Sequence, residues 1–321
     1  MTPAAKLLLF CMSRDRYVRR PDTDTAASNQ TRYVGRIFNA MAGEYDNLKD
    51  PWYGYTFAEI ERTIRRYFRP TSIGQSKPTA LDIGCGTGLQ SLVLAELGYK
   101  VKGIDIADDL IAIAAKKLSA AGFADAHFLH ADAEHLPFED GIADVINCCG
   151  PTLSFVPDWR AALKEISRCL KPDGKLLLEV EGKWTADIIW ELIDAVTGNS
   201  LDYDSSPRQA MKQFLPPWTI GHHIEYSFVL ESGTTVRMPL KLFTASELRR
   251  ELANAGLRIE KRWGLHCLTN LLPSTVLHRA DAGRLVRSIF YQLANLEHLV
   301  HGVWPFNALA CSLLVMAEKK R

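Results

Sequence analysis

The sequence predicts an α/β fold in which helices pack on both faces of a doubly wound parallel sheet. Three observations support this prediction. Short apolar segments alternate with amphipathic helices over residues 80–180, a glycine-rich turn joins the first segment to the first helix, and 47% of the 321 residues are hydrophobic. Alternating strands and helices are typical of β-α-β units, whose connections place helices on the sheet faces. A chain of this length and hydrophobic content can bury one large core.

The N-terminal region divides into two parts. Residues 1–30 are polar and charged and show no periodicity, which predicts a flexible segment. In residues 31–70, apolar side chains recur at helical spacing on both sides of Pro51, which predicts a helical cap made of two helices. The remaining residues, 71–321, are expected to form the main domain, with insertions at about 183–245 and 270–304.

The main domain alternates strands and helices most clearly in its first hundred residues. The predicted strands cover residues 80–83, 100–104, 126–130, 143–148 and 175–180, and the helices between them cover residues 89–97, 109–121 and 159–170. Further on, the pattern predicts a helix at 184–196, a β-hairpin around Glu231-Ser232-Gly233, a helix at 246–255, strands at 257–263 and 308–317, and helices within 273–303. We therefore expect a doubly wound sheet with N-terminal helices and a cap insertion that contains a β-hairpin and helices.

The residues that bind a ligand are predicted at the carboxyl ends of the first two strands. The first strand runs into Leu81-Asp82-Ile83-Gly84-Cys85-Gly86-Thr87-Gly88, where glycines let the backbone turn sharply and approach a ligand closely. The second ends in Gly103-Ile104-Asp105, and an acid at this place can accept hydrogen bonds from both hydroxyls of a ribose. Strand, glycine turn, helix, strand and acid in this order predict a site for an adenosine-containing ligand.

With these motifs, the segment from about residue 33 to residue 181 resembles the class I S-adenosylmethionine-dependent methyltransferases, which have a Rossmann-like fold. The resemblance implies that the glycine turn packs against the methionine part of the cofactor and that Asp105 holds its ribose. A third motif of the family matches Ala131-Asp132-Ala133-Glu134-His135-Leu136-Pro137-Phe138, which implies that Asp132 accepts a hydrogen bond from the adenine amino group. The cofactor-binding residues implied in this way are Tyr45, Asp82, Gly84, Gly86, Gly88, Asp105, Ile106, Asp132 and Ala133.

The helix before the main domain carries a further likeness. Phe38-Asn39-Ala40-Met41-Ala42-Gly43-Glu44-Tyr45-Asp46 resembles the N-terminal helix of the ubiquinone and menaquinone biosynthesis C-methyltransferases. This resemblance implies that Tyr45 covers the methionine end of the cofactor, while an aromatic residue that only packs the helix on the sheet is an equal alternative.

Methyl transfer from a sulfonium needs alignment of the acceptor and exclusion of water more than a reactive side chain, so the sequence predicts no particular catalytic residue. An oxygen or carbon acceptor would also need a base, and the candidates by residue type are His222, His223 and His266. The many apolar residues outside the sheet favour a small, apolar acceptor. The residues expected to line its pocket are Trp52, Tyr53, Trp184 and His223.

Charge and cysteine content exclude other classes of partner. With 38 basic against 37 acidic residues, the net charge of +1 provides no field that would gather nucleic acid. The seven cysteines show no paired metal or redox spacing, which suits a reducing, cytoplasmic setting. His127, His130 and His135 also lack metal-ligand spacing, so no metal site is predicted. No run reaches the roughly 18 apolar residues that a membrane span requires.

Two other functions remain open from the sequence. A nicotinamide-dependent oxidoreductase would need a glycine at position 89, where the chain has Leu89. A carboxylate at Asp82 would also repel a pyrophosphate, whereas it suits a ligand that carries an ammonium and a sulfonium group. A protein that binds the cofactor without catalysis is the second alternative, because methyl transfer has no obligatory catalytic side chain.

Overall fold

The structure of the chain is a computed structural model. The structure describes residues 26–43, 45–47, 51–70, 77–201, 203, 206–213, 223–229, 235–277 and 283–320. Most of the predicted flexible segment, residues 1–25, lies outside these ranges, and so does the predicted hairpin turn at 231–233. The first described helix, α2 (Ala26–Met41), begins inside that predicted segment.

In the described part of the chain, seven strands form one sheet in the order β3-β2-β1-β4-β5-β9-β8. The strands are β1 (Thr79–Ile83), β2 (Lys100–Asp105), β3 (His127–His130), β4 (Ala143–Cys148), β5 (Leu170–Glu181), β8 (Leu257–Leu265) and β9 (Ser312–Lys319). The first five are parallel, whereas β9 is antiparallel to both β5 and β8. The strand order reverses between β1 and β4, and a ligand crevice is expected at the carboxyl ends of such strands.

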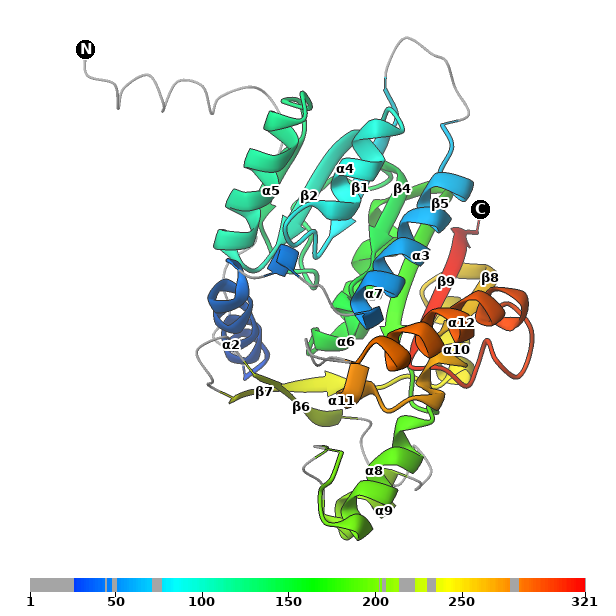
Figure 1. The fold of residues 1–321 in the computed structure, drawn as a ribbon. Helices are drawn as coiled ribbons and strands as arrows, with labels where there is room; N and C mark the ends of the chain where they lie inside the picture. The colour runs from blue at the N-terminus through cyan, green and yellow to red at the C-terminus, as the bar shows by residue number, and fades with distance from the viewer. Residues whose placement is uncertain are drawn as a thin grey trace.

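Helices cover both faces of this sheet (Figure 1). They are α3 (Pro51–Tyr67), α4 (Leu89–Glu96), α5 (Asp108–Ala120), α6 (Thr152–Phe155), α7 (Trp159–Cys169) and α10 (Ala245–Asn254). On one face, Ile60 of α3 and Leu94 of α4 are fully buried in the same apolar cluster. On the other face, Leu163 of α7 and Leu248 of α10 belong to a second cluster. The predicted doubly wound α/β architecture is therefore confirmed.

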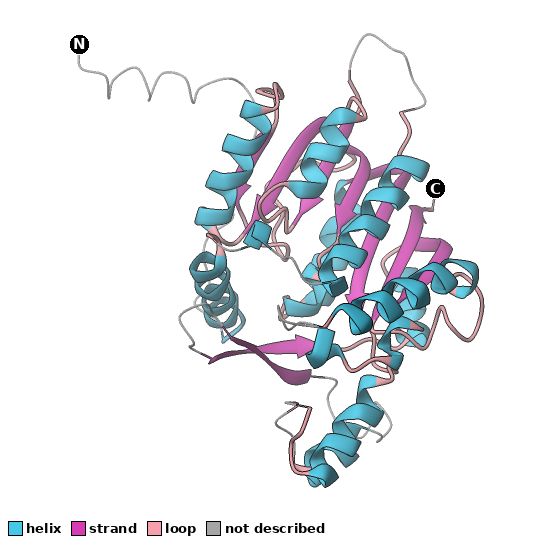
Figure 2. Cartoon of the chain, in the orientation of Figure 1, coloured by secondary structure: helices cyan, strands magenta, loops and turns pink. Residues whose placement is uncertain are grey.

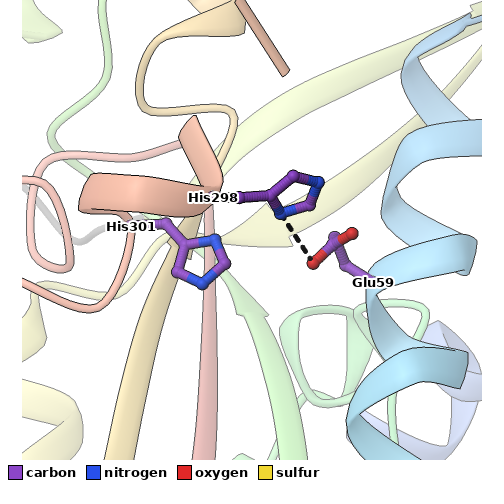
Figure 3. Close-up of side chains that lie close together, drawn as sticks. All are labelled: Glu59, His298 and His301. Atoms are coloured by element: carbon purple, nitrogen blue, oxygen red, sulfur yellow. Dashed lines mark ion pairs between the residues drawn. The ribbon is translucent and has the colours of Figure 1, made fainter. Parts of the chain in front are cut away.

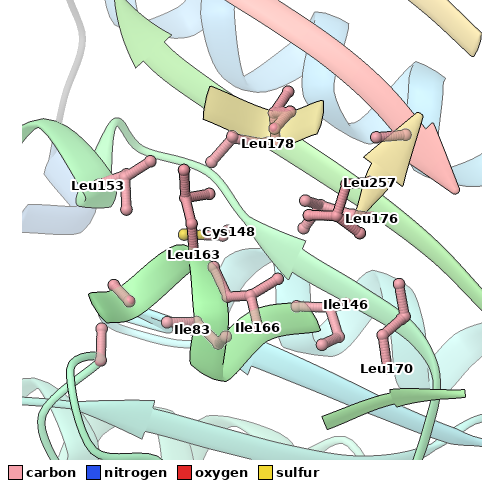
Figure 4. Packing of buried hydrophobic residues seen from close by; sticks show 14 of the residues in the cluster. Ile83, Ile146, Cys148, Leu153, Leu163, Ile166, Leu170, Leu176, Leu178 and Leu257 are labelled. Atoms are coloured by element: carbon pink, nitrogen blue, oxygen red, sulfur yellow. The ribbon is translucent and has the colours of Figure 1, made fainter. Parts of the chain in front are cut away.

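The alternating side chains of β5 explain how one strand serves both clusters. Leu176, Leu178 and Val180 point to the face covered by α7, and Leu177 points to the face covered by α3. Figure 4 shows Leu176 and Leu178 among the buried residues of the first cluster. All four side chains are fully buried, and each contributes roughly 1.5 to 3 kcal/mol of hydrophobic stabilisation.

A separate two-stranded ribbon lies beneath α2, apart from the main sheet (Figure 2). It consists of β6 (His223–Val229) and β7 (Thr235–Lys241), as the hairpin signal predicts. Met238 of β7 is fully buried against Val34 and Ile37 of α2. The N-terminal helix and the insertion, about 200 residues apart in sequence, therefore form one cap.

The chain after β5 adds further helices, of which α11 and α12 contact α3. These helices are α8 (Asp187–Thr197), α9 (Pro207–Gln213), η2 (Thr269–Leu271), α11 (Ser274–Leu277) and α12 (Arg284–Val300). The hydroxyl of Tyr55 on α3 donates a hydrogen bond of 3.0 Å to the buried Glu297 of α12. None of the helices in the described ranges combines the length and apolar character that crossing a bilayer requires.

Candidate cofactor and acceptor site

The glycine-rich turn joins the carboxyl end of β1 to the start of α4. Gly84, Gly86 and Gly88 have φ angles of +69°, +51° and +80°, in the left-handed region that glycine adopts without steric cost. The N–H groups of Gly84 and Cys85 both donate to the carbonyl oxygen of Ile104, at 2.8 and 2.9 Å. The turn is therefore fixed to β2 at the edge where the sheet order reverses.

The three glycines differ in what a side chain would meet. A Cβ atom at Gly84 would stand 2.1 Å from Oγ1 of Thr152, and one at Gly88 would stand 3.0 Å from a side chain of α5. Close packing within the protein therefore requires these two glycines. A Cβ atom at Gly86 would have Tyr45 as its nearest neighbour, at 3.6 Å, which is an ordinary van der Waals distance. The backbone of Gly86 thus lines the cavity without a side chain to cover it.

Asp105 ends β2 and is almost fully buried beside this turn. Its Oδ2 accepts a hydrogen bond of 2.8 Å from the N–H of Gly86, and its Oδ1 accepts one of 3.0 Å from the N–H of Ala107. Burial raises the pKa of Asp105, and the backbone N–H groups of Gly86, Ala107 and Ile106 oppose that shift. The carboxylate therefore shapes the turn as well as facing the cavity.

A cavity of about 640 Å³, including the part open to solvent, lies over the turn. Seven of the nine predicted cofactor-binding residues line it: Tyr45, Gly84, Gly86, Asp105, Ile106, Asp132 and Ala133. Asp82 and Gly88 do not belong to its lining.

The structure places Asp82 beneath the turn rather than beside the ligand. It is 1% exposed, and its carboxylate accepts hydrogen bonds from Oγ of Ser91 at 2.5 Å and Nδ2 of Asn147 at 2.8 Å. Strand alternation explains this position, since Leu81 and Ile83 point to the opposite face. Burial raises the pKa of Asp82 to about 6. Asp82 thus joins β1, β4 and α4 and does not line the cavity, and its contact with a ligand stays a prediction.

The acidic loop after β3 lies on the far side of Asp105. The N–H of Ala131 donates 3.0 Å to the carbonyl oxygen of Asp105, which fixes the start of the loop. Asp132 closes a turn by accepting a hydrogen bond of 2.9 Å from the N–H of Glu134, and it remains partly exposed to the cavity. Ala133 is buried beside it. The adenine edge implied by the resemblance thus has both a carboxylate and an apolar surface.

Tyr45 begins the short helix η1 (Tyr45–Asn47), which lies over the glycine turn. The next residue, Asp46, accepts a hydrogen bond of 2.6 Å from Oγ1 of Thr87 and an ion pair of 2.8 Å from Lys117. Burial, and then the nearby Asp105, raise the pKa of Tyr45, so its phenol remains a hydrogen-bond donor. Nothing in the sequence pointed to Asp46, whose contacts hold Tyr45 in place.

The other half of the cavity is apolar. Val34 and Phe38 of α2 line it together with Phe155, Val156 and Pro157. The rings of Phe38 and Phe155 meet edge to face, with centroids 5.5 Å apart. None of these residues was predicted for the site from the sequence. Their place along the chain could have indicated them, because the loop after β4 leaves the same edge of the sheet as the glycine turn.

Three of the four residues that the sequence suggested for the acceptor pocket lie outside the cavity. Trp52 stacks on His266 at a centroid distance of 3.6 Å, in a cluster at the contact of α3 and α12. The ring nitrogens of His266 are within 2.7 Å of Thr56 and 2.9 Å of Thr269. His266 is thus a structural residue with both nitrogens satisfied. Trp52, Tyr53 and Trp184 do not belong to the cavity lining. His222 and the side chain of His223 lie outside the described residues.

Two acids at the end of β5 form an unforeseen part of the region. Glu179 is buried and accepts hydrogen bonds of 2.8 Å from the N–H of Gly150 and from Oγ of Ser312. Burial, and then the charges of Glu179 and Asp187, raise the pKa of Glu181 to about 8. Gly150 lines the cavity, so Glu179 supports its wall. Two acids separated by one residue in an otherwise apolar strand are the sequence signal for such a role.

Of the three histidines considered for a metal, His127 and His130 lie on the exposed edge strand β3. His135 shares a small space with Asp132 and Glu134, whose ligand atoms all lie within 4.8 Å of one another. A second group of this kind, at the contact of α3 and α12, is described below.

Comparison with known proteins shows what this region of the chain is similar to. Residues 81–178 match the family model described as a methyltransferase domain. A demethylmenaquinone methyltransferase from Bacillus subtilis is 35% identical over 153 residues, which cover 47% of this chain and 63% of that protein. A sterol 4-C-methyltransferase from Caenorhabditis elegans is 32% identical over 148 residues, 46% of this chain and 37% of that protein. The chain therefore spans less than two thirds of these relatives.

Solved structures share the fold over more of the chain. A [4+2]-cyclase matches with a TM-score of 0.56 at 16% identity, over 91% of this chain and 97% of its own. An S-adenosylmethionine-dependent methyltransferase from Clostridium acetobutylicum matches with a TM-score of 0.51 at 12% identity, over 89% and 99%. Such low identities establish the fold alone. The sequence matches relate residues 81–178 to methyltransferase domains, and the solved structures show that the fold is shared with S-adenosylmethionine-dependent methyltransferases.

Proposed function

We propose that the protein is an S-adenosylmethionine-dependent methyltransferase that methylates a small apolar molecule. The observation that supports this function most is the division of one cavity into two halves. Carboxylates and glycine backbone form one half, with Asp105, Asp132 and Gly86, and aromatic and aliphatic side chains such as Phe38 and Phe155 form the other. A cofactor and an apolar acceptor can therefore meet within a single enclosed space.

The residues present fit this cofactor on two counts. Gly86 has a positive φ and lines the cavity, so its backbone can approach a ligand that a side chain would displace. The charged groups of this half, Asp105 and Asp132, are acids. A ligand that carries ribose hydroxyls, an adenine amino group, an ammonium and a sulfonium supplies donors and positive charge to such a set, whereas a pyrophosphate would be repelled.

Each residue then has a definable task. Asp105 would accept from the ribose hydroxyls, because a carboxylate offers about four lone-pair directions and two are occupied by backbone N–H groups. Asp132 would accept from the adenine amino group, and Tyr45 would cover the methionine end beside Gly86. When bound, the cofactor supplies a methyl group that is already activated by positive sulfur.

The protein therefore contributes mainly alignment and exclusion of water. Orientation of two reactants can lower a barrier by roughly 7 to 11 kcal/mol. Val34, Phe38 and Phe155 provide an apolar wall that would hold the acceptor in line with the methyl group and keep water out. The relatives named for quinone and sterol methylation support an acceptor of this apolar class.

Gly86→Ala tests the cofactor site directly. The new methyl group has no steric conflict within the protein, but it would occupy the space facing the cavity, so affinity for S-adenosylmethionine should fall at least tenfold in titration calorimetry. Gly141→Ala is the matched control, since Gly141 has a similar φ of +62° with nothing near its Cβ position. Both variants carry the same backbone strain, about 1 to 2 kcal/mol. Equal affinity in the two variants would overturn the assignment of the cavity.

Transfer itself is tested with a radiolabelled methyl group. The protein is incubated with labelled cofactor and with acceptor pools prepared from a cell extract, one soluble in organic solvent and one soluble in water. We expect label in the organic pool. Label confined to the water-soluble pool would overturn the apolar acceptor, and cofactor binding without any transfer would favour a non-catalytic binding protein.

A further inference from the structure

Three side chains with metal-ligating atoms meet at the contact of α3 and α12, away from the cofactor cavity. Glu59 lies on α3, His298 lies in the last turn of α12, and His301 follows the end of that helix. One ligand atom from each lies within 4.8 Å of the other two. Figure 3 shows the two imidazole rings and the carboxylate converging on one small space. Nδ1 of His298 is 3.4 Å from Oε2 of Glu59.

The surrounding packing keeps these groups together. His298 and His301 are three residues apart, so they share one face at the end of α12. The preceding residue, Glu297, is fully buried and accepts hydrogen bonds from the Tyr55 hydroxyl and from the backbone N–H of His266. These bonds fix the end of α12 to α3. The two histidines are thus positioned by a rigid contact and not by a loop.

One ring nitrogen of this group lacks a partner in the described part of the chain. Nδ1 of His301 is buried and has no hydrogen-bond partner among the described residues. An unsatisfied buried ring nitrogen is costly, and a bound cation would satisfy it.

Arg62 occupies the position that a cation would take. Its Nη1 donates to Oε1 of Glu59 and lies 3.3 Å from each ring nitrogen of His298. The Arg62 side chain is 58% exposed and can move into solvent, whereas the Glu59 side chain is only 5% exposed and needs a positive partner. A divalent ion bound to Glu59 would supply the positive charge that Arg62 now provides.

We propose that Glu59, His298 and His301 form a binding site for a divalent transition-metal ion, with zinc as the ion that fits best. Two imidazole nitrogens and one carboxylate oxygen are a donor set that zinc accepts, at about 2.0 to 2.2 Å from the metal, with a fourth position left for water. Ligand atoms in a tetrahedral shell stand roughly 3.3 Å apart, so the present spacing needs only small side-chain rotations. The site would join α3 to α12 and would take no part in methyl transfer.

Binding to the native state alone would stabilise the protein, because a ligand shifts the folding equilibrium toward the form that it binds. The experiment uses the full chain after removal of metal with a chelator and dialysis. Zinc is then titrated against a competing chromophoric chelator, and thermal unfolding is recorded with and without zinc. We expect one ion per chain and a higher unfolding temperature in its presence.

Variants assign the ion to this site. His298→Ala, His301→Ala and Glu59→Gln should each weaken zinc binding at least tenfold and abolish the thermal shift. Arg62→Ala should strengthen binding, because it removes the competing cation. His135→Ala is the matched control, since His135 belongs to the other group of possible ligands, and it should leave zinc affinity unchanged.

Several results would overturn the proposal. The unaltered chain could fail to bind zinc. His135→Ala could abolish binding, or binding could persist unchanged in Glu59→Gln and in both histidine variants. If a histidine variant fails to fold without zinc, Glu59→Gln and Arg62→Ala decide, since opposite changes in affinity are expected from them. Affinity that falls in Arg62→Ala would show that the arginine supports a structural ion pair and nothing else.

Discussion

Glu181 is the residue whose protonation should be visible in the stability of the protein. Its ordinary pKa of 4.5 is raised to about 8, first by burial and then by the charges of Glu179 and Asp187. Because the folded-state pKa lies above the unfolded value, the neutral carboxyl stabilises the fold fully below pH 4.5. That contribution is lost as the pH rises through 8.

Glu181→Gln should therefore unfold at the same urea concentration as the unaltered chain at pH 4.5 and be more stable at pH 9, by about 5 kcal/mol. Urea titrations at several pH values measure the difference. Glu139→Gln, which changes an exposed carboxyl, is the control and should show no such trend. Parallel pH profiles for Glu181→Gln and the unaltered chain would show that Glu181 is solvated in both states.

Asp105 and Asp132 should respond differently to the same substitution. In Asp105→Asn, an amide N–H must face one of two backbone donors, Gly86 or Ala107, so the free energy of unfolding should fall by about 1 to 3 kcal/mol. Affinity for S-adenosylmethionine should fall by roughly 2 to 4 kcal/mol. The two bonds mean that replacing Asp105 affects folding as well as binding.

Asp132→Asn should weaken cofactor binding less and leave stability unchanged, because the amide oxygen can still accept from the N–H of Glu134. Calorimetry for affinity and thermal unfolding for stability separate the two variants. Identical losses of affinity without any loss of stability for Asp105→Asn would contradict its role in shaping the turn.

The sequence could place the cofactor ligands because each follows a recognisable strand. Asp105 and Asp132 come directly after apolar runs, and the glycines carry their own conformational signal. It could not place Asp82, since its partners Ser91 and Asn147 come from α4 and β4 and only the packed sheet brings them together. A carboxylate within a binding motif can therefore stabilise the packing under the motif without lining the cavity.

For the strands, the apolar runs in the sequence predicted where each strand lies more accurately than where it begins and ends. The strand predicted at 175–180 extends over Leu170–Glu181, because Leu170 already pairs with Ala143 across a register shift. The strand predicted at 308–317 begins at Ser312, since residues 308–311 are apolar but lie in the preceding turn. Hydrophobicity reports burial in both cases, and hydrogen-bond pairing decides where a strand starts.

The helix α2 should contribute to acceptor binding through one face only. Phe38 lines the cavity and meets Phe155, so Phe38→Ala should raise KM for an apolar acceptor severalfold with a small loss of stability. Ile37 is 5% exposed and packs against Met238 of the hairpin, so Ile37→Ala should cost about 2 to 4 kcal/mol of stability.

Steady-state kinetics and urea unfolding of the two variants distinguish a wall of the pocket from a core contact on the same helix. The outcome that would contradict this division is an unchanged KM in Phe38→Ala together with a raised KM in Ile37→Ala.

For the whole molecule, the contacts that define function are those between distant segments. The cap joins Val34 to Met238, and the hydroxyl of Tyr33 donates 2.9 Å to the carbonyl oxygen of Arg237. The insertion of β9 between β5 and β8 likewise pairs elements far apart in the chain. A periodic pattern identifies each partner but not the pairing, so the sequence predicted the parts of the cap without its assembly over the cavity.

This assembly predicts a coupled response to the cofactor. Since α2 lines the cavity and β7 is packed on α2, binding of S-adenosylmethionine should slow backbone hydrogen exchange in both segments as well as in the glycine turn and β2. The edge strand β8 is the internal control, because it lies at the opposite end of the sheet order and should exchange at the same rate with and without cofactor. Mass spectrometry of peptides from α2, β7 and β8 measures all three. If exchange slows in α2 but not in β7, the hairpin packs on the helix without sharing its response to the cofactor. If only the glycine turn and β2 are protected, the cap is not part of the binding site.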